Sequence, residues 1–409
     1  MTTTDAAQIF IGRQPIFDVK DAVMGYELLF RNGSGNFCPQ IDSDLASRTS
    51  MERALMGFGL ESLTGNRLAF VNLSREVLLD GSYDLLPAGR VVLEILETID
   101  PDEQVIEACR AAKAKGYRLA LDDFTYRDDL EPLLDLADIV KVDLRAEEAA
   151  RERATAVAKD RGAILLAEKV ETHEERARAE QLGFSYFQGY FYSRPEVLEG
   201  RPLNPSMLGY LRLLSEVGAP EVSFERVEGL IRQDMALSVR LLRYLNSAGF
   251  GWRYEVKTIE QAVRLFGLEP LRKWVALLAV AAMADDKPTE LVVTGLIRAR
   301  LAESLGPVTG LSGRDLELFL TGLLSVLDAV MDRPLPELLK SLPVSNEVKS
   351  ALLERHPPLG PVLDLVLAQE TATWQVLDER SLQLGLESDR LPALYTGAIS
   401  WATSVLSDV

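Results

Sequence analysis

Charged and amide side chains interrupt or end a series of short apolar segments in the first half of the chain. They are Glu27, Asn72, Glu94, Asp122, Asp123, Lys141, Glu168, Glu171 and Gln188. Side chains at the C-terminal ends of the strands of a β/α barrel converge on one mouth. Because several carboxylates at one mouth repel one another unless cations neutralise them, the pattern predicts a divalent-metal site. Oxygen ligands of this kind suit Mg²⁺, Mn²⁺ or Ca²⁺.

Two divalent ions in such a site would support the hydrolysis of a phosphodiester. Ions about 4 Å apart can clamp the attacking and the leaving oxygen, and they turn a bound water into hydroxide near neutral pH. Phosphodiester cleavage is therefore the chemistry that we expect if these residues meet.

Each of these residues also has an ordinary structural explanation. A lone glutamate at a strand end is usually exposed to solvent. Asn72 could cap the helix that follows its strand, and Lys141 could pair with Asp138 or Asp143. The two adjacent aspartates after the fifth segment are harder to explain in this way, because neighbouring like charges gain nothing without a counterion.

The segments that must position these residues alternate with helical stretches rich in Ala, Glu and Arg, a pattern typical of β/α units. The segments are 9–17, 23–31, 68–73, 91–96, 118–123, 139–144, 164–170 and 186–192. Their continuous apolar character fits strands covered on both faces, and eight of them predict a closed, TIM-like α/β barrel. The first two are close enough to form a hairpin, which predicts an irregular first strand pair.

The period of the sequence changes after residues 194–206, where Pro and Gly are concentrated. Apolar residues then recur at helical spacing, as between Phe224 and Ile231. Thr258 and the glutamine three residues later form a candidate capping box at the start of a further helix. We therefore predict a barrel over residues 1–198 and an all-helical domain over residues 199–409.

Composition narrows the classes of partner and compartment. The net charge of -18 argues against a nucleic-acid partner, which needs a clustered basic face. Cys38 and Cys109 are too few for a disulfide framework, so we interpret both as ordinary thiols in a reducing compartment. The N-terminus shows no signal peptide, and the longest apolar run, 274–284, is too short to cross a membrane. These features predict a cytoplasmic protein without a membrane partner; His173 and His356 are isolated and are assigned no role.

Eight short motifs stand in order along the first half. The first two are Gln14-Pro15-Ile16, which matches Q-P-I, and Tyr26–Arg31, which matches E-A-L-x-R. Next come Phe70–Ser74, which matches an asparagine strand, Leu93–Glu97, which matches E-x-T-E, and Leu121–Phe124, which matches D-D-F. The last three are Lys141–Asp143, which matches K-x-D, Ala167–Glu171, which matches A-E-G-V-E, and Gln188–Tyr190, which matches Q-G-Y. Any one motif is weak, but together they resemble the EAL domain, the cyclic di-GMP phosphodiesterase fold.

The resemblance implies a role for each matching residue. It assigns one metal to Glu27, Asn72, Glu94 and Asp122, and a second to Asp122, Asp123 and Glu168. It implies Mg²⁺ or Mn²⁺ as the cofactor, with Lys141 orienting or activating the attacking water. Arg31, with Gln14 and Gln188 near it, would contact cyclic di-GMP, since a planar guanidinium grips phosphate well.

Several positions depart from the family pattern. Leu28 replaces the alanine of E-A-L, Leu96 the threonine of E-x-T-E, and Lys169 the glycine of A-E-G-V-E. The loop after D-D-F is Thr125–Leu130 where active members carry a G-T-G-Y-S-S type of loop. In the family this loop supports the metal-bridging aspartates and couples the site to dimerisation. Glu171 would tether it, so the change predicts a tether without its usual partner and a site with weak metal binding.

The second half resembles an HDOD domain, a helical relative of the HD phosphohydrolases. The resemblance rests on Ile231–Leu237, on Leu242–Ala248 and on Thr258–Leu268. Ser325 and Val326 stand where the His-Asp dipeptide of an HD hydrolase would be expected. Because imidazole is the ligand that such a metal site depends on, we expect this domain to bind a protein partner and not to hydrolyse phosphates.

Three interpretations follow from the sequence. The first is a signalling protein whose EAL domain binds cyclic di-GMP with weak or absent phosphodiesterase activity. The second is an active phosphodiesterase, and the third is a scaffold without a ligand. The retained ligand set favours binding and the altered loop argues against fast turnover. In the first interpretation the HDOD domain carries the output to an unidentified protein, and a homodimer is compatible with the resemblance.

Overall fold

The computed structural model describes residues 9–32, 59–194, 205–219, 221–233, 235–246, 256–285, 287–387 and 390–408. The chain divides into two compact units, Met1–Arg194 with Glu370–Thr373 and Pro195–Gln369 with Trp374–Val409. The predicted boundary after residue 198 lies outside the described residues, so it stays a prediction. Cys38, the N-terminal segment and three residues of the HDOD motifs, Asp234, Ser247 and Ala248, also lie outside them.

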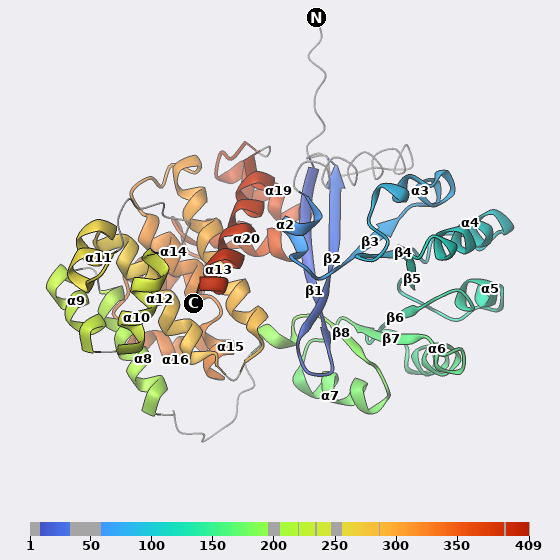
Figure 1. Cartoon of the computed structure of the whole chain (residues 1–409), viewed down its shortest axis with the longest axis horizontal. Coiled ribbons are helices and arrows are strands. Elements are labelled where there is room, and N and C mark those ends of the chain that lie inside the picture. Colours follow the sequence, from blue (N-terminus) through green and yellow to red (C-terminus); the bar gives the residue numbers. More distant parts are fainter. Residues whose placement is uncertain are drawn as a thin grey trace, which may run out of the picture. The chain divides into compact units, whose positions relative to one another are not determined.

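Eight strands of the first unit form a closed barrel in chain order (Figure 1). They are β1 (Ile9–Asp18), β2 (Val23–Asn32), β3 (Leu68–Leu73), β4 (Val91–Ile95), β5 (Arg118–Leu121), β6 (Ile139–Asp143), β7 (Ile164–Glu168) and β8 (Tyr186–Gln188). β1 pairs antiparallel with both β2 and β8, whereas the remaining neighbours are parallel. The predicted eight-stranded barrel with an irregular first pair is confirmed.

Helices connect the strands and cover the outside of the barrel, as Figure 1 shows for α3 to α6. They are α2 (Leu60–Thr64), α3 (Arg75–Asp80), α4 (Glu103–Ala114), α5 (Glu131–Leu134), α6 (Glu148–Asp160) and α7 (His173–Gln181), with short 3₁₀ turns η1 (Ser82–Leu85), η2 (Asp128–Leu130) and η3 (Phe191–Ser193). Ser74, Asp102 and Thr172 cap α3, α4 and α7 by accepting a hydrogen bond from a first-turn amide. These caps fix where each helix begins after its strand.

An apolar layer fills the inside of the barrel. It consists of Ile16, Phe70, Val92, Ala120, Ile139 and Leu166, one residue from each of six strands, with Met24, Leu68 and Tyr186 packed against it. Each of the six is at most 1% exposed. The barrel is therefore a packed core and not a pore, and this layer forms a floor for whatever lies above it.

The second unit is helical, as predicted. It contains α8 (Pro205–Gly218), α9 (Phe224–Gln233), α10 (Met235–Leu245), α11 (Ile259–Phe266), α12 (Leu268–Met283), α13 (Thr289–Leu305), η5 (Gly306–Val308), α14 (Asp315–Leu324), α15 (Leu327–Met331), α16 (Leu335–Ser341), α17 (Asn346–Glu354), α18 (Gly360–Glu370), α19 (Trp374–Gln383) and α20 (Leu391–Asp408). Thr258 accepts a hydrogen bond from the amide of Gln261 at the start of α11. The apolar run 274–284 lies in and just after the buried helix α12, and within the described ranges no helix is both long and apolar enough to cross a membrane.

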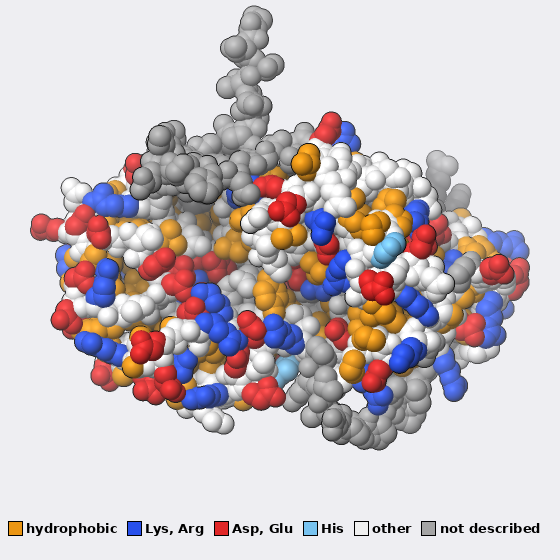
Figure 2. Space-filling model, turned by 180° about the vertical axis from the view of Figure 1, so that it is seen from behind, with side chains coloured by type: hydrophobic (Ala, Val, Ile, Leu, Met, Phe, Trp, Pro, Cys, Tyr) orange, Lys and Arg blue, Asp and Glu red, His pale blue; other side chains and the backbone are white. Residues whose placement is uncertain are grey.

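Charges of both signs share the surface. On the face that Figure 2 shows, the described Lys and Arg side chains are interspersed among Asp and Glu. This face therefore shows no cluster of basic side chains alone.

Candidate functional site

A layer of polar side chains lies directly above the apolar floor of the barrel. It consists of Gln14, Glu27, Asn72, Glu94, Asp122, Lys141, Glu168 and Gln188, one from each strand or, for Asp122, from the residue after β5. Side chains of a strand alternate between its two faces, so residues two apart share a face. Asn72, for example, follows Phe70 by two, and Lys141 follows Ile139 by two. We call this set the polar layer.

The ammonium of Lys141 lies at the centre of the polar layer. Its Nζ is 2.6 Å from Asp122 Oδ1, 2.9 Å from Glu94 Oε1, 3.0 Å from Glu168 Oε1 and 3.2 Å from Glu27 Oε2. The side chain is fully buried, as is that of Glu94, and the side chains of the other three carboxylates are 8–14% exposed. Four carboxylates that the sequence placed on four different strands therefore meet at one cation.

The alternative partners of Lys141 are occupied elsewhere. Asp138 pairs with Lys113 at 2.7 Å, and Asp143 pairs with Lys169 at 2.5 Å. The explanation of Lys141 as a local partner of either aspartate is therefore wrong.

Two amides complete the hydrogen bonding of Glu27. Gln188 Nε2 donates to Glu27 Oε2 at 2.6 Å and to Gln14 Oε1 at 2.8 Å. Asn72 Nδ2 donates to Glu27 Oε1 at 3.0 Å. Asn72 does not cap the next helix, because Ser74 is the cap of α3.

One ammonium does not balance four buried carboxylates, and their pKa values reflect this. Burial raises the pKa of Glu94 well above its usual value, and it also raises the pKa of Asp122. Burial raises the pKa of Glu168 to about 7. For Glu27, burial acts in the same direction, but Lys141 and the two amides outweigh it and the pKa is lowered.

The polar layer has the donor atoms that a divalent cation requires. Asn72 Oδ1, Glu94 Oε2 and Glu168 Oε2 are buried and accept no hydrogen bond. Oxygen acceptors of this kind fit Mg²⁺, Mn²⁺ or Ca²⁺. With the side chains as they stand around Lys141, however, the described part of the chain contains no group of three or more His, Cys, Asp or Glu placed to hold a metal ion.

Three predicted site residues lie apart from the polar layer. The side chain of Asp123 is 42% exposed and faces Lys169, at 3.5 Å. Glu171 pairs with Arg194 at 2.9 Å and with Arg145 at 3.6 Å. It therefore has partners other than the loop that the family resemblance assigned to it.

Arg31 is the third of these residues. It lies four residues beyond Glu27 on β2, which is roughly 13 Å of strand, and its guanidinium carbon is 5.7 Å from the centre of the Phe10 ring. In the strand register, Arg31 faces Phe10 while Gln14 faces Glu27. Arg31 and Gln14 therefore lie on paired strands, but they do not face each other in the register.

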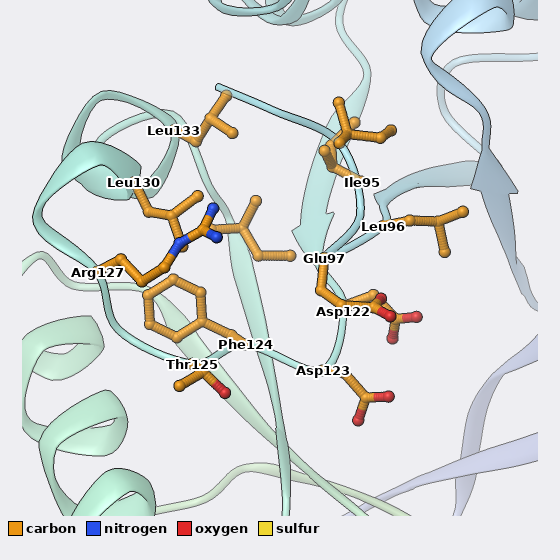
Figure 3. A pocket seen from close by; sticks show the side chains of 12 residues that line it. Ile95, Leu96, Glu97, Asp122, Asp123, Phe124, Thr125, Arg127, Leu130 and Leu133 are labelled. Carbon is orange, nitrogen blue, oxygen red and sulfur yellow. The ribbon is translucent and has the colours of Figure 1, made fainter. Parts of the chain in front are cut away.

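A pocket of about 180 Å³ opens beside the paired aspartates (Figure 3). It lies between the end of β4 and the loop after β5, and its walls are Ile95, Leu96, Glu97, Ile99, Leu121, Asp122, Asp123, Phe124, Thr125, Arg127, Leu130 and Leu133. The carboxylate of Asp123 points away from the apolar walls (Figure 3). Sequence reasoning singled out Leu96, the two aspartates and the loop after them, but it did not predict a pocket, because the position of this loop beside the end of β4 is set by tertiary contacts.

The second unit has a different arrangement at the position of the missing His-Asp dipeptide. Ser325 Oγ accepts a hydrogen bond from Arg298 Nη1 at 3.0 Å and donates to the carbonyl of Gly322 at 2.7 Å. Arg298 is only 8% exposed. A buried guanidinium therefore contacts the serine that stands in place of a metal-binding histidine.

Comparison with known proteins assigns a family to each part of the chain. The family model described as EAL domain matches residues 6–195, and the one described as HDOD domain matches residues 203–350. The cyclic di-GMP phosphodiesterase CdgJ of Vibrio cholerae serotype O1 is 34% identical over 97% of this chain and 93% of its own. The uncharacterized protein YuxH of Bacillus subtilis is 32% identical over 98% of this chain and 99% of its own.

Solved structures of proteins with an EAL domain are also similar to part of this chain. One is the Bacillus subtilis YkuI protein in complex with c-di-GMP and calcium, which is 24% identical over 45% of this chain and 53% of that chain, with a TM-score of 0.37.

Proposed function

This chain belongs to the family of proteins that join an EAL domain to an HDOD domain, and we propose that it is a bacterial signalling protein whose barrel binds cyclic di-GMP and hydrolyses it weakly or not at all. In this proposal the HDOD domain transmits the signal to a protein partner, and the protein acts in the cytoplasm.

The observation that carries the proposal is the polar layer. Seven strands and the residue after β5 each contribute one polar residue to the same level of the barrel, and the EAL resemblance gives all eight of these positions a role in metal, water or ligand contact. A buried layer with more carboxylates than cations is costly for folding, and a ligand-binding role would explain why the chain carries it. Its retention therefore supports a binding function for the barrel mouth.

The residues present suggest how a ligand would be held. Glu27, Asn72, Glu94 and Asp122 would hold a divalent ion, which when bound supplies Lewis acidity toward a phosphate oxygen. Without a divalent ion, the ammonium of Lys141 keeps these carboxylates close together. Arg31 would pair with a phosphate of the dinucleotide.

The loop after Asp123 supports the weak-turnover part of the proposal. None of residues 125–130, all of them described, has a positive φ of the kind that glycines supply in a G-T-G-Y-S-S loop. Tyr126 instead donates to Glu131, and Arg127 pairs with Asp129. The loop thus contacts its own residues as well as Glu131 and Arg153, whereas Glu171 pairs with Arg145 and Arg194.

An active phosphodiesterase is the second candidate. It is favoured by the name of the Vibrio cholerae relative, with 34% identity over 97% of this chain, and by the retention of every residue to which the resemblance assigns a metal. A third possibility, a scaffold without a ligand, becomes an outcome of the experiment below.

The proposal is tested by calorimetric titration of the full chain with cyclic di-GMP, with and without Mg²⁺, followed by product analysis of the same mixture. We expect binding with little linear product. Arg31→Ala should lower the affinity by about tenfold or more, since a charge-assisted phosphate contact contributes about 1.5–3 kcal/mol. Asp122→Asn should weaken Mg²⁺ binding, with Asp129→Asn on the exposed loop as the matched control.

Each result of this titration selects one interpretation. Rapid formation of linear product would establish the active enzyme instead. No binding at high micromolar ligand would leave the scaffold.

A further inference from the structure

Lys169 stands at a backbone position that favours glycine. It follows Glu168 directly, and its φ is +56°, in the left-handed region that L-residues with a side chain rarely adopt. A lysine that accepts this conformation next to a buried carboxylate calls for an explanation from its side chain.

The side chain of Lys169 reaches two aspartates of neighbouring segments. Its Nζ is 2.5 Å from Asp143 Oδ2 and 3.5 Å from Asp123 Oδ1. A lysine ammonium is charged at neutral pH. Asp123 therefore has a cation of the protein beside it.

Backbone hydrogen bonds hold Lys169 in this place. The amide of Val170 donates to the carbonyl of Gln188 at 3.0 Å, and the carbonyl of Val170 accepts from the amide of Phe191 at 3.2 Å. Both bonds involve the residue after Lys169. Although the lysine side chain is 53% exposed, its backbone cannot move away from Asp123 without breaking them.

Asp122 and Asp123 are adjacent but face different cations. The φ of Asp123 is +42°, and this turn sends its carboxylate out toward Lys169 while Asp122 points inward to Lys141. The sequence resemblance gives Asp122, Asp123 and Glu168 a shared second metal. In the structure, Asp122 and Glu168 contact Lys141, and Asp123 contacts Lys169.

We propose that the ammonium of Lys169 takes the place of the second divalent cation, so that the barrel mouth holds one divalent ion and one built-in lysine. The proposal rests on the proposed function, in which the mouth binds metal and cyclic di-GMP. A second divalent ion at Asp123 would lie within a few ångström of this ammonium and would compete with it for the same carboxylate. An ammonium can still attract a phosphate.

The proposal also accounts for binding without fast turnover. A lysine ammonium is a point charge with hydrogen-bond donors, and it carries no bound water that could become hydroxide. With one divalent ion, the mouth lacks the symmetric pair that stabilises both the attacking and the leaving oxygen.

The experiment measures how many Mn²⁺ ions each chain binds. Mn²⁺ alone is titrated into the full chain by calorimetry, and free Mn²⁺ is measured by electron paramagnetic resonance. We expect one Mn²⁺ per wild-type chain and two per chain for Lys169→Gly, which removes the ammonium and relaxes the backbone. Lys169→Met removes the charge alone and should also bind two. Lys115→Met removes another exposed, ion-paired lysine of the same barrel and should leave the number at one.

Each result has a definite meaning. Two ions in the wild type, or one ion in both folded Lys169 variants, would overturn the proposal while leaving the proposed function intact, provided that the wild type binds cyclic di-GMP. No ion and no cyclic di-GMP in the wild type would overturn both. The fold of each variant is checked by circular dichroism, and Lys169→Met decides if Lys169→Gly does not fold.

Discussion

Lys141 is the residue on which the polar layer depends. Its side chain is completely buried among four carboxylates, and these partners raise its pKa well above the usual value even though burial acts against the charge. A buried cation of this kind is not a strong source of stability in itself. Removing it is nevertheless expensive, because the partners it leaves behind are buried and unpaired.

Lys141→Met should destabilise the barrel by about 3–5 kcal/mol at pH 8, the usual cost of breaking a buried ion pair. Mg²⁺ should restore part of this loss, because it supplies positive charge to the same oxygens. The measurement is urea unfolding followed by far-UV circular dichroism, with and without Mg²⁺.

Lys115→Met is the matched control for this variant. Its lysine pairs with Asp84 at 2.5 Å but is 47% exposed, so the change should cost much less than Lys141→Met. An equal loss in the two variants would contradict the central role of Lys141.

Glu168 predicts a pH dependence of stability in the presence of a chelator. Its pKa rises from 4.5 in the unfolded chain to about 7 in the fold. Between these values the folded state holds a proton that the unfolded state does not, so this contribution is full below pH 4.5 and is lost as the pH rises through 7. The unfolding free energy of the wild type should therefore fall by up to about 3 kcal/mol from pH 5 to pH 8.

Glu168→Gln isolates this effect, because the amide does not titrate. The difference in unfolding free energy between the wild type and this variant should change with pH in the stated direction. A difference that stays constant from pH 5 to pH 8 would show that the carboxyl is ionised throughout this range in the folded chain and would contradict the prediction.

At the scale of elements, short connections set the geometry of the mouth. β5 ends at Leu121, so Asp122 and Asp123 lie at the start of the connection that follows this strand. The amide of Asp122 donates to Ile95, and the amide of Phe124 donates to Lys141. After β8, Gly189 has a φ of +146° and approaches Val170 so closely that a Cβ would lie 2.1 Å from its carbonyl oxygen. Only glycine fits there.

Replacing Thr125–Leu130 with G-T-G-Y-S-S should raise hydrolysis more than binding. The graft supplies glycines that allow positive φ, and catalytic groups displaced by about 1 Å can lose 100-fold in rate. We expect a 10- to 100-fold increase in linear product, measured by chromatography next to calorimetric affinity.

The matched control for the graft is A-T-A-Y-S-S, which has the same length without glycine. If the glycine graft folds and binds Mg²⁺ but forms no more product than this control, the fault lies deeper than the loop. Lys169 and Leu28 are then the residues to examine.

At the scale of the whole molecule, the two units differ in a way that makes them separately observable. All four tryptophans, at positions 252, 274, 374 and 401, belong to the second unit, and the barrel unit contains none. Tryptophan fluorescence therefore reports on the helical unit, whereas cyclic di-GMP is proposed to bind the barrel.

Addition of cyclic di-GMP and Mg²⁺ should raise the urea midpoint observed by tryptophan fluorescence if the barrel passes its signal to the helical unit. A ligand at 100 times its dissociation constant stabilises the domain that binds it by about 2.7 kcal/mol. The share of this stabilisation that appears in the tryptophan transition measures the coupling between the two units. Arg31→Ala should lose the shift. Binding seen by calorimetry with no change in the tryptophan transition would mean that the units respond independently.

The sequence by itself determined the level at which the polar residues lie. The strand period is local, so a polar residue two positions beyond an apolar one, such as Asn72 after Phe70 or Lys141 after Ile139, takes the same inward face. Eight such strands predict a barrel with one polar layer. The same reasoning predicted the helical second unit from its period, and the structure confirms both.

Only the tertiary structure decided which charges meet. Lys141 and Glu27 are 114 residues apart, and no local pattern distinguishes this contact from a pair with Asp138 or Asp143. The positive φ of Asp123 is equally hidden, because a non-glycine residue takes it only when its surroundings impose it. Sequence reasoning therefore expected two metals to balance the mouth, whereas the fold brings two lysines to the same carboxylates.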